Sequence, residues 1–330
     1  MMEALHRRGH ELTLVSRIMD EERVLLPAVE AICRKIYLVP HHRSRSGSRG
    51  LAIAQSYLDL RGKIKEVVAI EQPDFVHVET TQTALAAVGL RLPPSSYRTQ
   101  DVNWFLIDQS LPRLRGTQRA IAHVKRAFFR WLEPWISRHY DLMLAISEGD
   151  RRLLAETCDD DHLLLVPLVP AVRPEATTVP AVDGEANVLF VGAMSRDHNR
   201  TGVVWFLDGV WEHIAAAVPE ARLYIVGGQP PESLTSRADG EHVIVTGFVD
   251  DLGAWYRSAS VFVSPLLVAG GLLQKVMDAM AMGVPVVATS VCNHGVGATP
   301  GVHLITADEP EAFAEAVIAL LEDSQARLRL

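Results

Sequence analysis

Residues 270–290 read GGLLQKVMDAMAMGVPVVATS. A glycine pair opens this stretch, apolar residues at helical spacing fill its middle, and a short apolar run closes it. We therefore expect a helix over about 272–282, followed by a buried strand over 285–289. Lys275 and Asp278 lie three positions apart, so a helix would present both side chains on one face. By itself, such a pair is equally typical of a solvated helix surface.

The second half of the chain repeats this alternation. Apolar runs predict strands at 187–193, 221–228, 242–249, 260–267 and 302–306. Helical spacing predicts helices at 199–218, 251–259 and 310–323. Strands that are apolar throughout and alternate with helices indicate a parallel sheet covered on both faces. Ligands of such Rossmann-like sheets bind at the carboxyl ends of the strands.

In the first half of the chain, predicted strands and helices alternate less clearly. We expect strands at 11–16, 35–39, 74–79 and 141–147, and a long helix over 119–136 that is kinked or broken near Pro134. The proline-rich, aperiodic stretch 166–184 indicates a connection between domains. We therefore predict a Rossmann-like domain over 1–170, a linker over 171–186, and a second Rossmann-like domain over 187–330.

Composition narrows the classes of function. The chain has 330 residues, of which 48% are hydrophobic and 22% charged, as in a globular protein of two domains. Its cysteines, Cys33, Cys158 and Cys292, are far apart, which argues against disulfides and against a zinc or other metal site. No apolar run reaches the length of a membrane span. We expect a cytoplasmic protein without a cofactor or metal.

The charge is divided unevenly. Residues 1–172 carry 23 Lys and Arg against 21 Asp and Glu, and residues 173–330 carry 9 against 19. A net charge of −8 argues against nucleic acid as a partner. The basic tract 41–50 and the helix 119–136, which mixes basic and aromatic residues, suit an anionic membrane surface. A solvated loop and ordinary core packing are the alternatives.

Four segments of the second half together carry a resemblance to a known family: FVGAMSRDHN (190–199), LYIVGG (223–228), VTGFVDDLGAWYRSASVFVSPL (245–266) and the 270–290 stretch. They resemble the donor-binding domain of retaining glycosyltransferases of family 4, in particular those that make bacterial surface polysaccharides. The resemblance implies the GT-B fold, in which two Rossmann-like α/β domains with parallel sheets face a cleft. It also implies transfer of a sugar, with retention, from a nucleotide-diphosphate sugar to a glycan or lipid-linked acceptor, without a metal.

The resemblance gives Lys275 and Asp278 roles. It implies that Lys275 faces the diphosphate, as a catalytic cation, and that Asp278 holds the ribose hydroxyls. The backbone around Gly270, Gly271 and Leu272 is expected to open a helix N-terminus, which is a ready anion site.

Further positions follow from the same motifs. Gly192 is expected to allow close approach of phosphate, and Arg196 to bind the diphosphate as a second catalytic cation. Asn199 matches the family but is also typical of a helix N-cap. The turn Gly247–Phe248–Val249 is expected to receive the base.

The sequence departs from the family pattern at several positions. Asp278 stands where relatives usually have glutamate, and Gly270 where many have a second glutamate. Residues 100–103 read QDVN where relatives often read HNVE, which removes a histidine near the transferred sugar. His294 stands where relatives frequently carry glutamate; we interpret it as a solvated loop residue, with the sugar pocket as the alternative.

Two other functions remain open at this point. One is a non-catalytic homologue that binds nucleotide sugar as a partner subunit, and the other is an epimerase of the same architecture, which would need several carboxylates in the cleft. The resemblance also implies that relatives have a strand before residue 1 and a helix beyond residue 330. We therefore expect the first domain to be less stable than the second, and the membrane contact, if formed, to be peripheral at the inner face.

Overall fold

The computed structural model describes residues 1–18, 23, 26–40, 49–172, 174 and 179–330. These residues form two compact units, 1–99 with 133–144, and 100–132 with 145–330. Residues 100–132 and 145–170, which the sequence placed in the first domain, belong to the second unit. Most of the basic tract, residues 41–48, lies outside the described residues.

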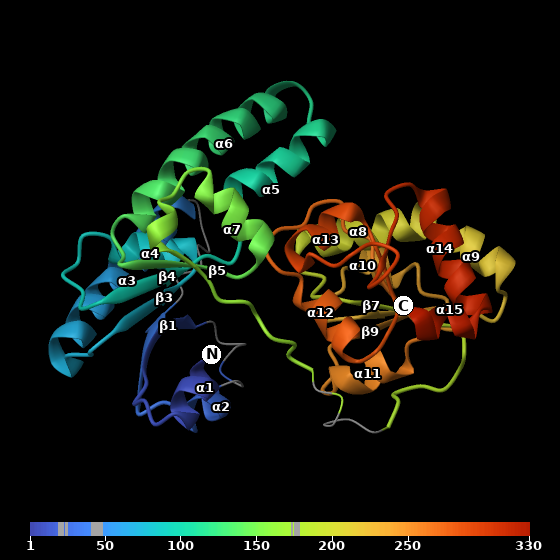
Figure 1. Ribbon diagram of the computed structural model, residues 1–330, viewed down its shortest axis with the longest axis horizontal. Coiled ribbons are helices and arrows are strands. Elements are labelled where there is room, and N and C mark those ends of the chain that lie inside the picture. The colour runs from blue at the N-terminus through green and yellow to red at the C-terminus, as the bar shows by residue number, and fades with distance from the viewer. Residues whose placement is uncertain (19–22, 24–25, 41–48, 173, 175–178) are drawn as a thin grey trace. The chain divides into compact units, whose positions relative to one another are not determined.

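The strands of the first half form two parallel sheets (Figure 1). Strand β1 (Thr13–Ile18) pairs with β2 (Lys35–Pro40) in a two-stranded sheet. The second sheet has the order β3-β4-β5-β6, with β3 at Val76–Glu79, β4 at Ser95–Arg98, β5 at Leu142–Ala145 and β6 at Leu163–Leu165. The accompanying helices are α1 (Met2–Arg7), α2 (Leu26–Glu30), α3 (Arg49–Glu71) and α4 (Thr81–Ala87).

The sequence analysis missed β4 because its sequence, SSYR, is short and polar. Its first three residues are nevertheless buried. Their polar atoms find partners: the backbone N–H and the Oγ of Ser95 both donate to Asp141 Oδ2, at 2.7 and 3.1 Å. Ser96 Oγ lies 2.7 Å from His77 Nδ1 on the neighbouring strand. Buried polar side chains that are fully paired can replace apolar ones in a central strand.

The second unit contains a six-stranded parallel sheet in the order β12-β11-β10-β7-β8-β9. The strands are β7 (Asn187–Val191), β8 (Arg222–Val226), β9 (Val243–Gly247), β10 (Val261–Ser264), β11 (Val286–Ala288) and β12 (Ile305–Thr306). This confirms each strand expected in the second half. Every residue of β7, β10 and β11 is buried, as a parallel sheet covered on both faces requires.

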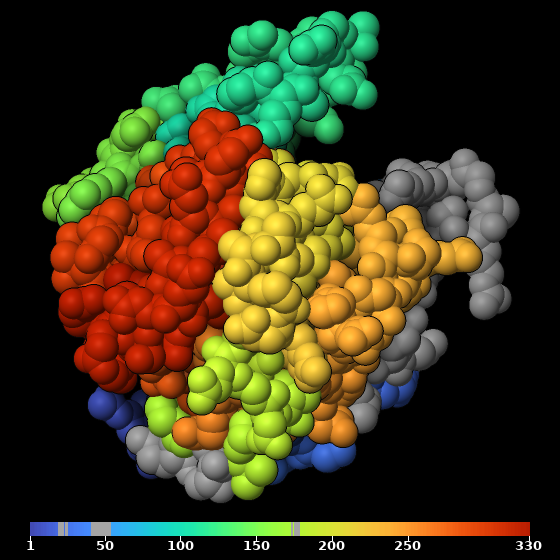
Figure 2. Space-filling view, turned by 90° about the vertical axis from the view of Figure 1, so that its right-hand side faces the viewer, coloured from blue at the N-terminus to red at the C-terminus, as the bar shows by residue number. Residues whose placement is uncertain are grey.

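Helices cover this sheet on both faces (Figure 1). Helices α8 (Asp197–Gly209), α9 (Trp211–Ala217) and α14 (Pro310–Glu322) pack against one another, and Figure 2 shows them side by side in yellow and red. Helix α11 contacts β7, and α12 contacts β10 and β11. The remaining helices are α10 (Glu232–Thr235), α11 (Leu252–Ser258), α12 (Gln274–Ala281), α13 (Ser290–Val296) and α15 (Ser324–Arg329). The predicted helix 199–218 is in fact two helices, since α8 ends at Gly209.

The six-stranded sheet and the helices on its two faces share one hydrophobic core. Aromatic side chains fill it, and Phe206 on α8 and Phe313 on α14 stack edge to face at 5.8 Å between ring centroids. Burial of a large aromatic side chain contributes about 1.5–3 kcal/mol to stability. By contrast, the residues of β1 are all only half-buried, and β1 pairs only with β2 among the described strands.

Three further helices belong wholly or mostly to the second unit: α5 (Asn103–Ser110), α6 (Gly116–Ser137) and α7 (Glu148–Ala155). We predicted a kink or a break near Pro134; α6 runs through this residue, so the helix is not broken there, and a kink stays a prediction. Pro134 lies in the last turn, and because it has no N–H, the helix lacks the hydrogen bond to the Arg130 carbonyl there. No helix among the described residues is both long and apolar enough to cross a membrane.

Candidate functional site

The order of the strands creates a switch point in the second sheet. Strand β7 lies between β8, which follows it in sequence, and β10, which comes much later. The loops that leave β7 and β10 therefore turn away from each other, which opens space at the carboxyl ends of the two strands. The loop after β7 carries Gly192 and Arg196, and the loop after β10 leads to Lys275.

The side chain of Lys275 lies at this switch point. Its Nζ donates a hydrogen bond to Asn199 Oδ1 at 2.6 Å and lies 4.4 Å from the centroid of the Phe190 ring. Within the described part of the chain, no carboxylate forms an ion pair with it. Desolvation lowers the pKa of Lys275 to about 8. The site thus holds a desolvated ammonium whose charge is not neutralised, which is what an anionic ligand needs.

Gly192 makes this position of Lys275 possible. A Cβ at residue 192 would lie 2.9 Å from Lys275 Nζ and 2.7 Å from Asn199 Nδ2. Neither distance leaves room for a carbon atom. The structure therefore places Gly192 beside the predicted cation, and any larger residue would displace the Lys275–Asn199 pair.

The N-cap interpretation of Asn199 was wrong. The N-cap of α8 is Arg196, and Asn199 lies within the first turn, almost completely buried. Its Nδ2 donates to the carbonyl of Ala193 at 2.9 Å, and its Oδ1 accepts from Lys275. Because both ends of the amide are used, Asn199 orients the lysine.

Asp278 points to a different neighbour from Lys275, so the two do not form a surface pair. Its Oδ1 accepts hydrogen bonds from the backbone N–H groups of Ala171 and Val172, at 2.6 and 3.3 Å, and from Gln274 Nε2 at 3.0 Å. The residue is only 5% exposed. Through these hydrogen bonds, Asp278 holds Ala171 and Val172, at the start of the linker, against α12. Its Oδ2 makes no hydrogen bond to any described residue.

The glycine pair lies in a loop and not in the helix. Gly271 has a φ of +60°, which a helix does not allow, and α12 begins at Gln274, two residues later than predicted. A Cβ on Gly270 would lie 2.5 Å from Leu106 Cδ2, and one on Gly271 would clash with the Gln100 carbonyl. The glycines thus allow residues 100–106 to pack closely.

The first turn of α12 remains open to a ligand. Its N-cap, Leu273, has no side-chain oxygen and makes no side-chain capping bond. The N–H of Val276 donates to the Leu273 carbonyl at 3.0 Å, which leaves the N–H groups of Gln274 and Lys275 as the ones that could attract an anion. The helix start that was predicted at Gly270, Gly271 and Leu272 therefore lies a little further along the chain, beside Lys275.

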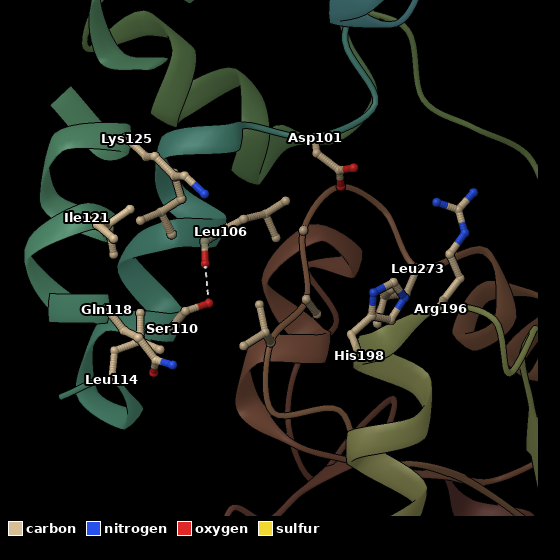
Figure 3. Close-up of a pocket in the computed structure, with 15 residues that line it drawn as sticks. Asp101, Leu106, Ser110, Leu114, Gln118, Ile121, Lys125, Arg196, His198 and Leu273 are labelled. Carbon is tan, nitrogen blue, oxygen red and sulfur yellow. Dashed lines mark hydrogen bonds between the residues drawn. The ribbon is translucent and has the colours of Figure 1, made fainter. Parts of the chain in front are cut away.

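A pocket of about 700 Å3 adjoins this site (Figure 3). Arg196, His198 and Leu273 line one side of it, and residues of α5 and α6 line the other. Asp101 stands at the edge between them; burial raises the pKa of its carboxyl, and the charge of Arg196 opposes this rise. The structure thus brings Arg196 to the site, together with Asp101.

His198 is a site residue that the sequence analysis missed. Burial lowers its pKa, and the positive charges of Lys275 and Arg196 lower it further. A neutral imidazole in this position can donate or accept a hydrogen bond. Its signal in the sequence is weak, since only its place between Arg196 and Asn199 points to a role.

Asp150 is a second residue that the sequence did not reveal. It lies in the first turn of α7 and is 1% exposed; its Oδ2 accepts a hydrogen bond from Ser147 Oγ at 2.7 Å, and its Oδ1 has no partner in the described part of the chain. Burial raises the pKa of Asp150 to about 6, and the charge of Asp101 adds to this rise.

His294 is not a solvated loop residue, as the sequence suggested. It lies on α13, half-buried, with its ring stacked on Phe105 at 4.5 Å between centroids. Its Nε2 is buried and has no hydrogen-bond partner among the residues that the structure describes, and burial lowers the pKa of the ring. The packing against Phe105 and the nearby Gly149 backbone accounts for its position.

The turn predicted to receive a base lies at the end of β9. Gly247 has a φ of +76°, which favours glycine there. Phe248 is 80% exposed, and its Cβ lies next to Gly228 at the end of β8. Val249 is half-buried against the core. An exposed phenyl ring beside a glycine loop can stack on an aromatic ligand.

Among the described residues, no group of three potential ligands could hold a metal ion. The site instead combines an ammonium, a guanidinium and free amide groups at the end of a parallel sheet. These are groups that bind a diphosphate through charge and hydrogen bonds.

Known protein families match both halves of the chain. Residues 1–168 match the family described as "Glycosyl transferase 4-like domain", and residues 185–323 match "Glycosyl transferases group 1". One relative, an uncharacterized 44.6 kDa protein in the cps region of Klebsiella pneumoniae, is 30% identical over 96% of this chain and 84% of its own length. The phosphatidyl-myo-inositol mannosyltransferase of Mycobacterium leprae is 34% identical over 60% of this chain and 54% of its own length.

A solved structure supports the same fold over the whole chain. HepE of Anabaena, in complex with UDP-glucose, matches with a TM-score of 0.69 and 14% identity, over 99% of this chain and 86% of HepE. Likeness at this level of identity concerns the fold. It confirms the predicted architecture, α/β with two Rossmann-like domains of parallel strands, which is called GT-B.

Proposed function

Because this chain belongs to the GT-B glycosyltransferases, with a glycosyl transferase 4-like domain followed by a group 1 domain, we propose that it transfers a hexose from a nucleotide-diphosphate sugar to an acceptor with retention. Relatives named for phosphatidyl-inositol and lipopolysaccharide mannosyl transfer support a role in polysaccharide or glycoconjugate synthesis. A neighbour that binds UDP-glucose supports the donor class.

The observation that carries this proposal is the uncompensated charge of Lys275 beside the open first turn of α12. A sugar leaves its donor as the diphosphate gains negative charge. Lys275, Arg196 and the free N–H groups of α12 would stabilise this charge where it develops. Preorganised cations of this kind make a metal unnecessary for the leaving group.

The other donor contacts follow from the same placement. Gly192 lets the diphosphate approach the backbone, and the Gly247–Phe248–Val249 turn receives the base by stacking. Asp278 offers its free Oδ2 to the ribose hydroxyls, while its Oδ1 stays with Ala171 and Val172. Because aspartate is shorter than glutamate, this contact needs the ribose to lie close to α12.

Turnover of a donor panel tests the proposal. The full chain is incubated with UDP-, GDP- and ADP-hexoses, and nucleoside diphosphate release and the anomer of the released sugar are followed by NMR. We expect one donor to be turned over slowly in water, with the donor's anomeric configuration kept in the first product. Binding of a donor without any turnover would favour the alternative, a non-catalytic subunit that binds nucleotide sugar.

A further inference from the structure

The two oxygens of Asp278 are used differently. Its Oδ1 accepts three hydrogen bonds, two from the backbone N–H groups of Ala171 and Val172 and one from Gln274 Nε2. Its Oδ2 accepts none from a described residue, and it is not sealed off from solvent, although the residue as a whole is only 5% exposed. One oxygen is therefore committed to the protein, and the other stays free for a ligand.

Gln274 connects the committed oxygen to the chain that leads into the linker. Its Nε2 donates to Asp278 Oδ1 and to the Val169 carbonyl, both at 3.0 Å. A side-chain amide nitrogen carries two protons, so both hydrogen bonds can form at the same time. Gln274 and Asp278 lie one turn apart on α12, and together they hold the backbone of residues 169–172 against this helix.

These hydrogen bonds fix the plane of the Asp278 carboxylate. The χ2 torsion of an aspartate is broad and roughly two-fold, so a carboxylate without partners turns easily. Here the donors come from two separate segments, the backbone at 171–172 and the first turn of α12. A carboxylate whose one oxygen is held in this way presents the other in one direction. A ribose diol needs such a fixed direction, because hydrogen bonds weaken steeply as their angle closes.

The helix that carries this arrangement is itself held in place. Val276 and Ala279 on α12 are completely buried, and Tyr256 Oη donates a hydrogen bond to the Lys275 carbonyl at 3.1 Å. These contacts do not involve the side chain of Gln274. Its loss should therefore leave Lys275 in place and change only the direction of the Asp278 carboxylate.

A second pair of the same kind shows what an ordinary helix-surface role looks like. Gln55 Nε2 donates to Asp59 Oδ1 at 2.7 Å, also across four residues, on the exposed surface of α3. Such pairs stabilise a helix modestly. Asp278, in contrast, is buried and accepts two further hydrogen bonds from outside its own helix. The pair on α12 therefore orients a buried carboxylate as well as stabilising the helix.

We propose that Gln274 is a positioning residue for donor specificity. It turns the Asp278 carboxylate so that Oδ2 accepts from the ribose hydroxyls, and it thereby makes the site select ribonucleotides. The inference rests on the proposed function, in which Asp278 Oδ2 receives the ribose. Gln274 itself does not touch the ligand. It contributes to the discrimination between a ribose and a sugar without hydroxyls, and not to the binding of the diphosphate.

Competition between a ribonucleoside diphosphate and its 2′,3′-dideoxy analogue tests this role, with whichever of UDP, GDP and ADP binds most tightly. The full chain is compared with Gln274→Met, which keeps the length of the side chain and removes both hydrogen bonds. Gln55→Met, which removes the exposed pair on α3, is the matched control. We expect the preference for the ribonucleotide to fall about five-fold in Gln274→Met, as the loss of a hydrogen bond predicts, and to stay unchanged in Gln55→Met.

The dideoxy analogue should bind all three proteins equally, because it makes no use of the Asp278 carboxylate. A preference that Gln274→Met retains in full overturns the inference, even where proteolysis near residue 171 becomes faster. That result would restrict Gln274 to holding the chain at Val169.

The pH profile of Gln274→Glu separates positioning from a merely structural role. The introduced carboxyl cannot donate while it is ionised, but it can donate to Asp278 Oδ1 once it is protonated. The neighbouring charge of Asp278 raises the pKa of this carboxyl. We therefore expect the preference of Gln274→Glu for the ribonucleotide to be weak at pH 8 and to return toward the wild-type value at pH 5. Lys275 acts on both nucleotides alike, so its titration cancels in the ratio. A ratio that stays low at both pH values would contradict the inference.

This inference and the proposed function fail in different ways. If no nucleoside diphosphate binds the wild type, the proposed function fails, and the role of Gln274 with it. If one binds and Gln274→Met keeps the full preference for ribose, the donor site stands and the positioning role is wrong. If the wild type itself does not prefer the ribonucleotide, the ribose contact of Asp278 is wrong, while binding of the diphosphate beside Lys275 stands.

Discussion

The ammonium of Lys275 and the amide oxygen of Asn199 lie 2.6 Å apart, at the point where the strand order of the second sheet reverses. The two residues lie in the first turns of α12 and α8, the helices that follow β10 and β7, so only the folded sheet brings them together. Asn199 supplies a dipole but no charge. It can therefore hold the lysine in place without neutralising it, and a bound diphosphate can gain the full attraction of the cation.

The lowered pKa of Lys275 predicts a pH dependence for donor binding. The ammonium is present below its pKa of about 8 and is lost as the pH rises through that value. The affinity for a nucleotide sugar should therefore fall between pH 7 and pH 9. Lys275→Met has no group to titrate, so the slope should vanish in this variant. Calorimetric titrations at four pH values check this, and a wild-type affinity that stays constant would contradict it.

Asp278 is expected to serve both the ribose and the connection between domains. Asp278→Asn keeps an oxygen for the N–H groups of Ala171 and Val172. It replaces the second oxygen, which would accept from a diol, by an NH2 group that can only donate. We expect it to reduce the preference for a ribonucleoside diphosphate over its 2′,3′-dideoxy analogue, as measured by competition. Asp278→Ala should in addition speed proteolysis of the chain near residue 171. An unchanged preference in both variants would restrict Asp278 to the structural role.

The buried carboxyl of Asp150 predicts a loss of stability as the pH rises. Its folded pKa of about 6 lies above the ordinary aspartate value. The contribution of the protonated carboxyl to the free energy of unfolding is therefore complete below about pH 4 and is lost as the pH rises through 6. Asp150→Asn should remove this loss. Between pH 4 and 7, the free energy of unfolding of the variant should gain about 2–3 kcal/mol relative to the wild type. Asp74→Asn, at an exposed position, is the control, and urea unfolding at both pH values is the measurement.

The two sheets predict different local stabilities. Every residue of β1 is only half-buried and β1 has one partner among the described strands, whereas β7 is completely buried between β8 and β10. Amide hydrogens of β1 and β2 should therefore exchange faster than those of β7 and β8, because strands with few buried contacts open more often. Hydrogen exchange by mass spectrometry measures this. Equal protection of both sheets would show that β1 is stabilised by contacts that its burial does not reveal.

The sequence predicted the second sheet well because its strands carry the signal that parallel sheets require. Runs such as 187–191 and 261–264 are apolar throughout, and each was confirmed as a strand. In contrast, β4 was missed, since its buried serines depend on Asp141 and His77, which are distant in sequence. Local patterns do not show such partners.

The site residues also divide into those with a local signal in the sequence and those whose partners are distant in sequence. The motif around Lys275 allowed an anion site to be predicted, because glycines and a helix start are local features; this site stays a prediction. The roles of Asn199, His198 and Asp150 depend on burial and on neighbours from other loops, so they appear only in the structure. The helix start moved from Leu272 to Gln274 because residues 100–106 pack against the glycine loop.

Calorimetric titration of UDP, GDP and ADP into the wild type and into Lys275→Met tests the central claim most directly. Lys65→Met, which removes an exposed lysine of α3, is the matched control. The account predicts that one of the three nucleotides binds the wild type and the control equally. It also predicts that Lys275→Met weakens this binding about ten- to a hundred-fold, since a hydrogen bond to a charged group contributes about 1.5–3 kcal/mol. Equal binding to all three proteins, with the fold of Lys275→Met intact by circular dichroism, would contradict the assignment of the donor site.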